Sequence, residues 1–453
     1  MFGAADPSER LDVTSMNLRR LSLLSVTVAV AALAGALAVP ATGQDDDATT
    51  PAEEEALPER VAVIDVDSPE RSLFRIAVPN LRGERTLGPQ GASTLRNDFR
   101  LVSLFEVLDA RSFVADLDAE GLSIVPSAWS AVGAQGVIKG EIERDGGALE
   151  VRMRLYEVAR GDAPSLSRTY RGRVAELPQF MHQFANEVLQ VLTGRAGAFG
   201  TRITFARRRG PGRKDIMVAS FDGDRVSRVS SGEGIAMLPS FGRGGVWYSI
   251  LSDERMFITR TGVNERPVIG GDGLNMGVSV CGGTVFFSST RDGNAEIYRS
   301  NLDGTEIVRL TDHPGIDVSP ACGGPGGRVA FVSTRHGSPQ IFTMNANGGA
   351  VTRVTFRGQH NQTPAWCPRN DDGPLLAFTG RSGGFDIFTV NLQTQEYTRL
   401  TQGQGVNKDP AFSPDCRMVA FYSSRGGIFL SSPEGLNQNL VIPGHAETLQ
   451  WSR

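Results

Sequence analysis

The most regular pattern along the chain is a short apolar strand that recurs through its C-terminal half. The copies centre on aromatic residues separated by 43, 39, 44, 47 and 43 residues, namely Phe205, Tyr248, Phe287, Phe331, Phe378 and Phe421. A period near 40 to 45 residues with several short strands in each unit is typical of β-propeller blades. We predict that these aromatic side chains are buried between neighbouring sheets, because burial of a large apolar side chain stabilises a fold by about 1.5 to 3 kcal/mol.

Each repeat carries further strand signals at similar distances from its aromatic residue. A second strand follows, centred on Ile216, Met256, Ile297, Ile341, Ile387 and Ile428. A third run ends in motifs such as Arg309-Leu310-Thr311, and motifs such as Pro364-Ala365-Trp366 then begin the next unit. Four strands that repeat six times predict six blades over residues 201–453.

The repeat is divided between the two ends of this region. Residues 203–205 match the second strand of a blade, whereas Leu449, Gln450 and Trp451 match a first strand. A ring of sheets that did not close would leave strand edges exposed to wrong pairing. We therefore predict that the C-terminal strand completes the blade that begins at residue 201.

Residues 61–194 alternate strand and helix patterns instead. Strands are expected at 61–64 and 74–78, and the alternation of Leu149, Val151, Met153 and Leu155 with charged residues is typical of a strand with one solvated face. Helical spacing runs from Leu177 to Leu192, and Gly194 fits a left-handed C-cap. Another helix is expected around 89–101 and a shorter one around 127–132. The predicted fold is an α/β N-terminal domain followed by an all-β six-bladed propeller closed by the C-terminal strand.

Residues 1–43 have the pattern of a leader and signal peptide. Arg19 and Arg20 precede the apolar run 21–37, and residues 41–43 are of the small type that signal peptidase prefers, with Met16 as an alternative start. The apolar run is at the short limit for a membrane span, which favours cleavage over a membrane anchor. The chain is therefore expected to be exported.

Composition changes sharply after the predicted cleavage site. Residues 44–60 hold seven acidic residues and two prolines with few large apolar groups, so we expect an acidic disordered tether. The whole chain has 46 Lys and Arg against 50 Asp and Glu, for a net charge of -4. This balance offers no electrostatic basis for binding nucleic acid.

Four cysteines, Cys281, Cys322, Cys367 and Cys416, follow the innermost strands of four successive repeats. An even count in an exported chain suggests disulfides, which would join 281 to 322 and 367 to 416. A disulfide needs Cα atoms within about 7 Å. Because adjacent blade turns can lie farther apart, free buried thiols are the favoured alternative.

Candidate catalytic groups are sparse. The chain has no G-x-S-x-G motif, which argues against a propeller-bearing peptidase. The remaining enzymatic alternative is a metal-dependent carbohydrate lyase sited in the channel, with His313, His360 and His445 as candidate ligands. His360 and His445 share one position in their repeats, but His313 does not, and Ile316 and Val406 occupy the matching position in other repeats. No convergent ligand set results, so we expect no catalytic residues, no metal and no cofactor. His182 is expected on the solvated face of its helix.

Several longer segments resemble one family. FSPDCRMVAFYSSRGG (412–427) and RVAFVSTRHGSPQIFTMNANGGAVTRVT (328–355) resemble the TolB-type propeller repeat. LTGRAGAFGTRITF (192–205) is similar to the junction between the α/β domain and the propeller of that family, and FRIAVPNL and SAWSAVGAQGVIKGEI also fit its first domain. The resemblance covers residues 61–453 in order.

This resemblance implies a monomeric, non-enzymatic adaptor of the periplasm that works in the Tol-Pal envelope system. Its propeller would bind the peptidoglycan-associated lipoprotein Pal, and its N-terminal segment would bind TolA of the inner-membrane motor. Such an adaptor supports outer-membrane integrity and constriction at cell division.

The resemblance also implies where these partners bind. Pal would dock on loops that lead into the innermost strands, at Leu274, Asn275, Ile316, Asp317, Asn361, Gln362, Lys408 and Asp409. The TolA-type segment corresponds to Val61, Val63, Ile64 and Asp65, which could add an edge strand to a partner sheet. Because the acidic tether precedes it, the recognition segment lies either at residues 61–67 or within the tether.

Overall fold

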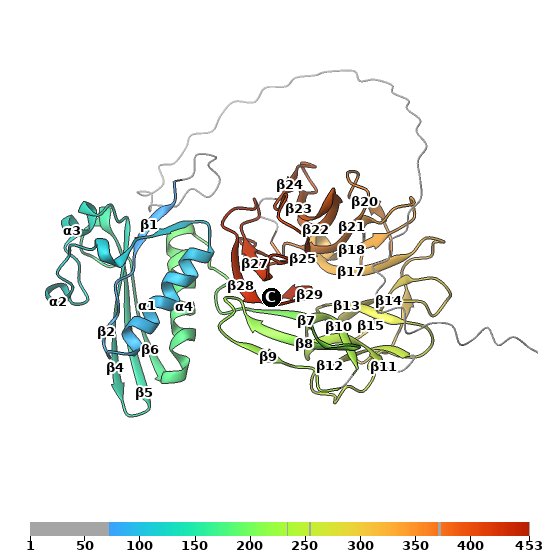
Figure 1. The fold of residues 1–453 in the computed structure, drawn as a ribbon, viewed down its shortest axis with the longest axis horizontal. Coiled ribbons are helices and arrows are strands. Elements are labelled where there is room, and N and C mark those ends of the chain that lie inside the picture. Colours follow the sequence, from blue (N-terminus) through green and yellow to red (C-terminus); the bar gives the residue numbers. More distant parts are fainter. Residues whose placement is uncertain (1–71, 233, 253–254, 370–372, 453) are drawn as a thin grey trace, which may run out of the picture.

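The computed structural model describes residues 72–453, apart from residues 233, 253–254, 370–372 and 453. An N-terminal domain of strands and helices is followed by a larger region of small sheets (Figure 1). The signal peptide, the acidic tether and the strand expected at 61–64 lie outside the described residues. Within the described part of the chain, no helix has the length and apolar character needed to cross a membrane.

The N-terminal domain is built on one mixed sheet with the strand order β3-β1-β4-β5-β6, and β2 pairs with β4. Its strands are β1 (Phe74–Ala77), β2 (Arg82–Gly83), β3 (Phe105–Val107), β4 (Gly136–Asp145), β5 (Ala148–Glu157) and β6 (Leu166–Arg173). In β5, Leu149, Val151 and Met153 are buried whereas Glu150 and Arg152 are partly exposed. This alternation confirms the prediction of a strand with one solvated face.

Two long helices, α1 (Leu87–Leu101) and α4 (Leu177–Thr193), lie side by side between this sheet and the propeller (Figure 1). Gly194 ends α4 with a φ of 72°, the left-handed cap that the sequence predicts. The shorter helices are α2 (Leu117–Glu120) and α3 (Pro126–Ala131), and Trp129 of α3 is fully buried in a second, smaller core. Single 3₁₀ turns occur at Ala110–Ser112, Val158–Arg160, Val174–Glu176 and Pro325–Gly327.

Four sheets of the second region each contain four antiparallel strands in sequence order. They are β13 to β16 (Asn275–Cys281, Thr284–Ser289, Glu296–Asn301, Val308–Arg309), β17 to β20 (Asp317–Gly324, Arg328–Ser333, Gln340–Met344, Thr352–Arg353), β21 to β24 (Asn361–Trp366, Leu375–Ser382, Gly384–Asn391, Tyr397–Arg399) and β25 to β28 (Asn407–Phe412, Val419–Ser423, Gly427–Ser431, Asn439–Pro443). We call each of these sheets a blade.

The remaining strands form a sheet with the order β12-β11-β10-β8-β7-β29, and β9 pairs with β8. Its strands are β7 (Arg202–Gly210), β8 (Arg213–Ser220), β9 (Val226–Arg228), β10 (Ile235–Gly242), β11 (Gly245–Ser252), β12 (Arg255–Arg260) and β29 (Glu447–Trp451). The C-terminal strand β29 lies antiparallel to β7, with Gln450 opposite Thr204 and Trp451 opposite Ile203. Two blades are thus joined where β8 meets β10 at one residue pair, Ile235 and Lys214.

The six aromatic centres of the repeat are at most 2% exposed: Phe205, Tyr248, Phe287, Phe331, Phe378 and Phe421. Their partners across the blade are often aromatic as well, as in Phe378 and Phe388, whose ring centroids lie 5.6 Å apart. The predicted burial is confirmed. These rings form the packing layer of the blades and are not available to a ligand.

The structure contains both candidate disulfides. Cys281 is bonded to Cys322 and Cys367 to Cys416, with Cα separations of 6.1 and 5.5 Å. The preference for free thiols was therefore wrong, because the ends of the innermost strands and the segments just after them approach closely enough for bridging. Each disulfide joins a blade to the next one in the chain.

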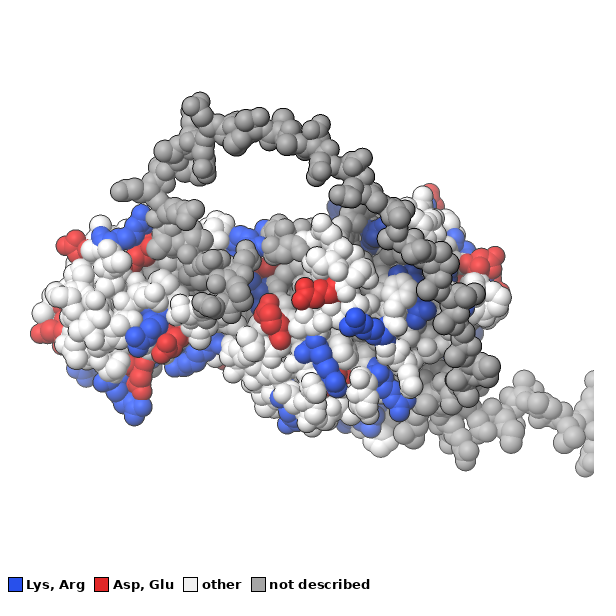
Figure 2. Space-filling model, turned by 90° about the horizontal axis from the view of Figure 1, so that it is seen from above, with Lys and Arg blue, Asp and Glu red and all other residues white. Residues whose placement is uncertain are grey.

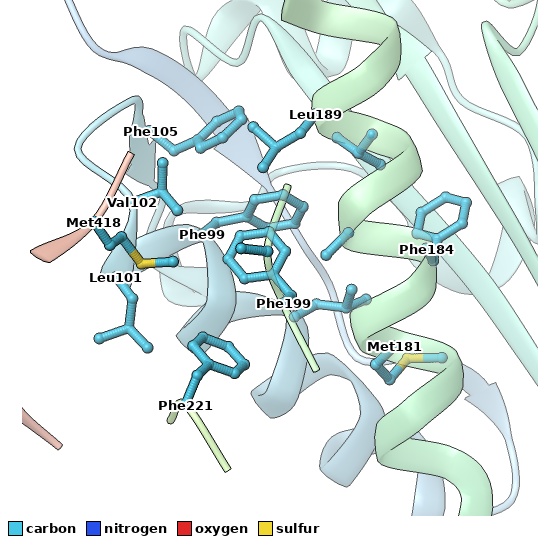
Figure 3. Close-up of a cluster of buried hydrophobic side chains, with 14 of the residues drawn as sticks. Phe99, Leu101, Val102, Phe105, Met181, Phe184, Leu189, Phe199, Phe221 and Met418 are labelled. Carbon is cyan, nitrogen blue, oxygen red and sulfur yellow. The ribbon is translucent and has the colours of Figure 1, made fainter. Parts of the chain in front are cut away.

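The two domains share one hydrophobic core. Phe199 lies against Phe99 of α1 and Phe221 of the propeller, and Met418 of the propeller lies beside Leu101 and Val102 at the end of α1 (Figure 3). The guanidinium of Arg417 adds polar contacts, because it donates to the Thr193 hydroxyl and to the carbonyl oxygens of residues 195 and 196. The junction thus also satisfies carbonyl groups that follow the C-terminus of α4.

His182 lies at this junction, contrary to the expectation of a solvated position. Its imidazole is buried, and its Nδ1 lies 2.8 Å from Asp98 Oδ2. His182 lies on the face of α4 that points away from the N-terminal sheet and toward the propeller. The propeller covers that face, so the sequence of the helix alone could not reveal its burial.

Replacement of Trp451 by alanine should test how far β29 supports the fold. The indole is 4% exposed and donates a hydrogen bond of 2.7 Å to Thr201 Oγ1. We expect Trp451→Ala to lower the free energy of unfolding by about 3–5 kcal/mol, measured by urea denaturation. Leu436→Ala is the control, because Leu436 is 64% exposed and should change little. Equal small effects in both variants would contradict a packed β29.

Candidate partner-binding surface

The innermost strands of the blades surround one cavity of about 160 Å³. Residues of β10, β13, β17, β21, β25 and β29 all line it. The same strands begin at one end of the region, where the loops from the preceding blades enter. We call this end the mouth, and it is where the sequence predicts the Pal-facing residues.

A β-bulge interrupts each of these six innermost strands at the same level. Every strand shifts its register there, and one residue takes a positive φ between 51° and 69°: Leu238, Gly277, Ser319, Thr363, Asp409 and Thr448. A bulge bends its strand, and a positive φ is strained for a residue other than glycine. The ring of bulges therefore shapes the cavity and gives it a defined backbone conformation.

Buried hydroxyl groups of the preceding blades hold several of these bulges in place. The backbone N–H of Gly277 donates to Ser249 Oγ at 3.2 Å, and that of Ser319 donates to Ser288 Oγ at 3.2 Å. The N–H of Asp409 donates in the same way to Thr379 Oγ1 at 3.0 Å. Because these bonds cross from one blade to the next, they hold neighbouring bulges at the same height along the cavity.

A second set of polar contacts lies nearer the mouth, at the first residue of the third strand. Glu296 is fully buried there and accepts hydrogen bonds from Thr311 Oγ1 at 2.6 Å and Arg309 Nη2 at 2.9 Å. The equivalent Asp386 accepts from Thr401 and Arg399. Two Arg-x-Thr motifs at the end of the third run thus neutralise and satisfy a buried acid, whereas Thr355 of the motif Arg353-Val354-Thr355 donates to Gln340.

Three of the predicted partner-binding residues belong to this buried network. Asn275, Asp317 and Asn361 are at most 2% exposed. Asn361 Nδ2 donates to Gln340 of the preceding blade at 2.8 Å, and Asp317 pairs with Arg335 at 2.7 Å. These side chains thus join strands and blades, and they are buried instead of exposed at the mouth.

The other predicted residues lie on or near the mouth surface. Ile316 is 42% exposed, and Leu274, Gln362 and Lys408 are partly exposed, whereas Asp409 lies deeper, at the level of the bulges. The Lys408 ammonium lies 4.4 Å from the centre of the Phe385 ring, which is a cation–π contact. Val406, which is 39% exposed beside them, was missed by sequence reasoning although it occupies the position equivalent to Ile316.

Charge at the mouth is mixed. Burial raises the pKa of the Asp409 carboxyl, and the hydrogen bond that it accepts from the Thr448 N–H at 2.7 Å opposes this effect. On the face of the whole molecule seen in Figure 2, Lys and Arg side chains lie among Asp and Glu side chains. At the mouth itself, the exposed Ile316 and Val406 lie beside the charged Lys408, so apolar and charged groups occur side by side.

Each of the three loop histidines contacts a residue two positions further along the chain. His313 Nδ1 accepts from the Gly315 N–H at 2.9 Å, His360 Nε2 lies 2.8 Å from Gln362 Oε1, and His445 Nε2 lies 3.6 Å from Glu447. Among the described residues, the group that could together hold a metal ion is a different one, at the domain junction. The structure therefore offers no observation in favour of the lyase alternative.

Comparisons with known proteins match both domains. A profile of the TolB amino-terminal domain matches residues 62–163, and a profile of the TolB beta propeller domain matches residues 189–379. The Tol-Pal system protein TolB of Myxococcus xanthus (strain DK1622) is 36% identical over 325 residues, which cover 69% of this chain and 74% of that protein. The chain belongs to the TolB family.

Other members of the TolB family agree with this assignment over shorter lengths. The Tol-Pal system protein TolB of Anaeromyxobacter dehalogenans (strain 2CP-C) is 35% identical over 58% of this chain, and the match spans 63% of that protein, less than two thirds. The crystal structure of TolB from Acinetobacter baumannii has a TM-score of 0.73 at 23% identity, over 84% of this chain and 96% of that one. That structure shares the fold, an N-terminal domain followed by a propeller.

Removal of the Arg335 guanidinium should show how much the buried Asp317 carboxylate destabilises the fold when its charged partner is missing. Arg335→Met leaves the Asp317 carboxylate without its charged partner, and we expect a loss of about 3–5 kcal/mol in unfolding free energy near pH 7. Burial already raises the pKa of Asp317, although Ser333 and Arg335 oppose the rise. Loss of Arg335 should raise that pKa further, so the loss of stability should shrink as the pH falls.

The matched variant combines Asp317→Asn with Arg335→Met, which removes both charges. Urea denaturation of the double variant should show a smaller loss than Arg335→Met alone near pH 7. A double variant that is as unstable as the single one at every pH would show that packing around Arg335, and not the buried charge, carries the effect.

Proposed function

We propose that this chain is a periplasmic adaptor of the Tol-Pal system that works by reversible protein binding and has no catalytic role. The observation that carries the proposal is the TolB match along both domains, because the matched relatives are named Tol-Pal system protein TolB. Export would depend on the signal peptide within residues 1–43. In this role the protein would support outer-membrane integrity and constriction at cell division.

We infer that the propeller is a closed ring of six blades. The pairing of β29 with β7 supports closure, and the six equivalent bulges around one cavity support the count. Closure matters for the proposed role because a ring without free sheet edges gives a rigid mouth. A rigid surface loses little conformational freedom on binding, which favours affinity.

The proposed Pal-binding surface is the mouth. Ile316 and Val406 would supply exposed apolar contacts, and Lys408, Gln362 and Leu274 would supply the contacts beside them. Large exposed apolar groups beside charges are typical of the contact residues of protein interfaces. The buried Asn275, Asp317 and Asn361 would then act indirectly, because they hold the loops that present these side chains.

The proposed TolA-binding element is the N-terminal segment that includes Val61, Val63, Ile64 and Asp65, ahead of the described residues. Its short run of apolar residues, at positions 61–64, suits addition of a strand to the edge of a partner sheet. Pal and TolA would in that case bind at separate places, one on the propeller and one on the N-terminal segment. A single chain could then link both partners.

Ile316→Glu is the sharpest test of the Pal-binding surface. Pull-down and titration with the cognate lipoprotein should show affinity at least about tenfold weaker than wild type, because a charge replaces a buried apolar contact. The control is Val308→Glu on β16, because Val308 has the same 42% exposure as Ile316 but lies outside the mouth. Equal binding by both variants would reject the mouth as the site, and no binding by wild type would reject the function.

Deletion of residues 61–67 should separate the two proposed interactions. The shortened protein should no longer capture the cognate TolA domain, whereas its affinity for Pal should stay within about twofold of wild type. A matched deletion of residues 45–51 in the acidic tether should retain TolA. Loss of TolA binding in the second variant alone would move the recognition segment into the tether.

A further inference from the structure

Three titratable side chains meet at the junction of the two domains. Asp98 comes from α1, His182 from α4, and Asp222 from the turn that follows β8 in the propeller. His182 Nδ1 lies 2.8 Å from Asp98 Oδ2, and His182 Nε2 lies 3.8 Å from Asp222 Oδ2. The imidazole therefore stands between a carboxylate of each domain.

The surroundings of this cluster exclude bulk water. The side chains of Asp98, His182 and Asp222 are 0%, 6% and 8% exposed. The Phe221 ring lies edge-on to the imidazole at 5.4 Å, and Asp98 Oδ1 has no hydrogen-bond partner among the described groups. Charges are costly in such a place unless they are paired, so the protonation state of the cluster must affect the junction.

The geometry suits a shared proton better than a metal ion. The two carboxylates face opposite edges of the imidazole ring, and one ion can be bound by only one ring nitrogen at a time. A neutral imidazole carries one N–H, so one of the two carboxylates would face a nitrogen lone pair. An imidazolium carries two N–H groups and can donate toward both carboxylates.

We propose that Asp98, His182 and Asp222 form a protonation-dependent latch that ties the N-terminal domain to the first blade of the propeller. In the latched state, a positively charged His182 donates toward one carboxyl group of each domain, and the Asp98 carboxyl can itself carry a proton at the lower pH. Loss of its proton leaves Asp98 and Asp222 as two buried negative charges without a cation between them. The latch does not depend on the identity of the binding partners.

The electrostatics of the cluster agree with this proposal. Burial alone would lower the pKa of His182, but the hydrogen bond and charge of Asp98 and the charge of Asp222 raise it overall, against a small opposing effect of Arg225. Burial raises the pKa of Asp98 to about 6, although His182 opposes the rise. Both groups thus hold protons more tightly in the folded junction than in the unfolded chain.

The sign of the pH dependence follows from these two shifts. A group whose pKa is raised by folding stabilises the fold below its unfolded pKa and loses that contribution as the pH rises through its folded pKa. The contribution of Asp98 should therefore fade between about pH 4 and its folded pKa, and that of His182 above about pH 6.5. The junction should loosen as the pH rises, while the shared apolar core keeps the domains together.

Hydrogen–deuterium exchange of the full chain at about pH 5 and about pH 8 tests the latch, because this interval spans the titration of histidine. After correction for intrinsic exchange rates, amides of α1 and α4 should exchange severalfold faster, relative to β18 and β19, at the higher pH. His182→Gln and Asp222→Asn should each remove most of this pH effect. His336→Gln, a change at an exposed histidine of the propeller, should leave it as in wild type.

Three results would overturn the latch. The first is wild-type protein in which α1 and α4 show the same pH response as β18 and β19. The second is a full wild-type pH effect in both His182→Gln and Asp222→Asn. The third is a stoichiometric transition metal in the purified protein whose removal by a chelator reproduces the loosening at constant pH, since the cluster would then be a metal site.

Discussion

The pairing of β29 with β7 is the interaction on which the rest of the propeller depends. β7 is the first strand of that region and β29 is the last, yet Gln450 lies opposite Thr204 and Trp451 lies opposite Ile203. Without this pairing, β7 would present a free edge and the innermost position of that blade would be empty. Every other innermost strand is followed by its own second strand, so local contacts suffice to form those blades and this one alone needs the two ends to meet.

The backbone around the cavity is held by several further contacts between blades. Six bulges set the same level around the cavity, and hydroxyls such as Ser249 and Ser288 satisfy the bulged backbone of the next blade. Buried polar residues, such as Asp317 with its partner Arg335 and Asn361 with its partner Gln340, hold the starts of several innermost strands, and two disulfides link successive blades. A partner that docks at the mouth would therefore meet a surface that is already formed, which lowers the entropic cost of binding. At the opposite ends of the strands, the shared core around Phe99 and Phe221 connects the same scaffold to the N-terminal domain.

Much of the fold could be predicted because its signals are local. The spacing of the aromatic residues and the alternation in β5 report strands directly, and Gly194 marks the end of α4. The candidate site was harder to predict. Asn275, Asp317 and Asn361 lie where a loop meets a strand, and the sequence there does not distinguish a solvated polar side chain from a buried one. The burial of His182 depends on a second domain, and the disulfides depend on distances between blades, neither of which a single sequence pattern contains. The only sequence signal near the bulges is the proline that follows the bulged residue in four of the six innermost strands: Pro239, Pro320, Pro364 and Pro410.

Pairing of the two distant strands can be measured most directly by engineered cross-linking. Thr204→Cys combined with Gln450→Cys places thiols on residues that face each other across β7 and β29. The expected result is a third intramolecular disulfide, seen by peptide mapping under non-reducing conditions, in addition to the 281–322 and 367–416 bridges. Free thiols at both engineered positions, in protein that retains the two native bridges, would contradict the closure of the propeller by its C-terminal strand.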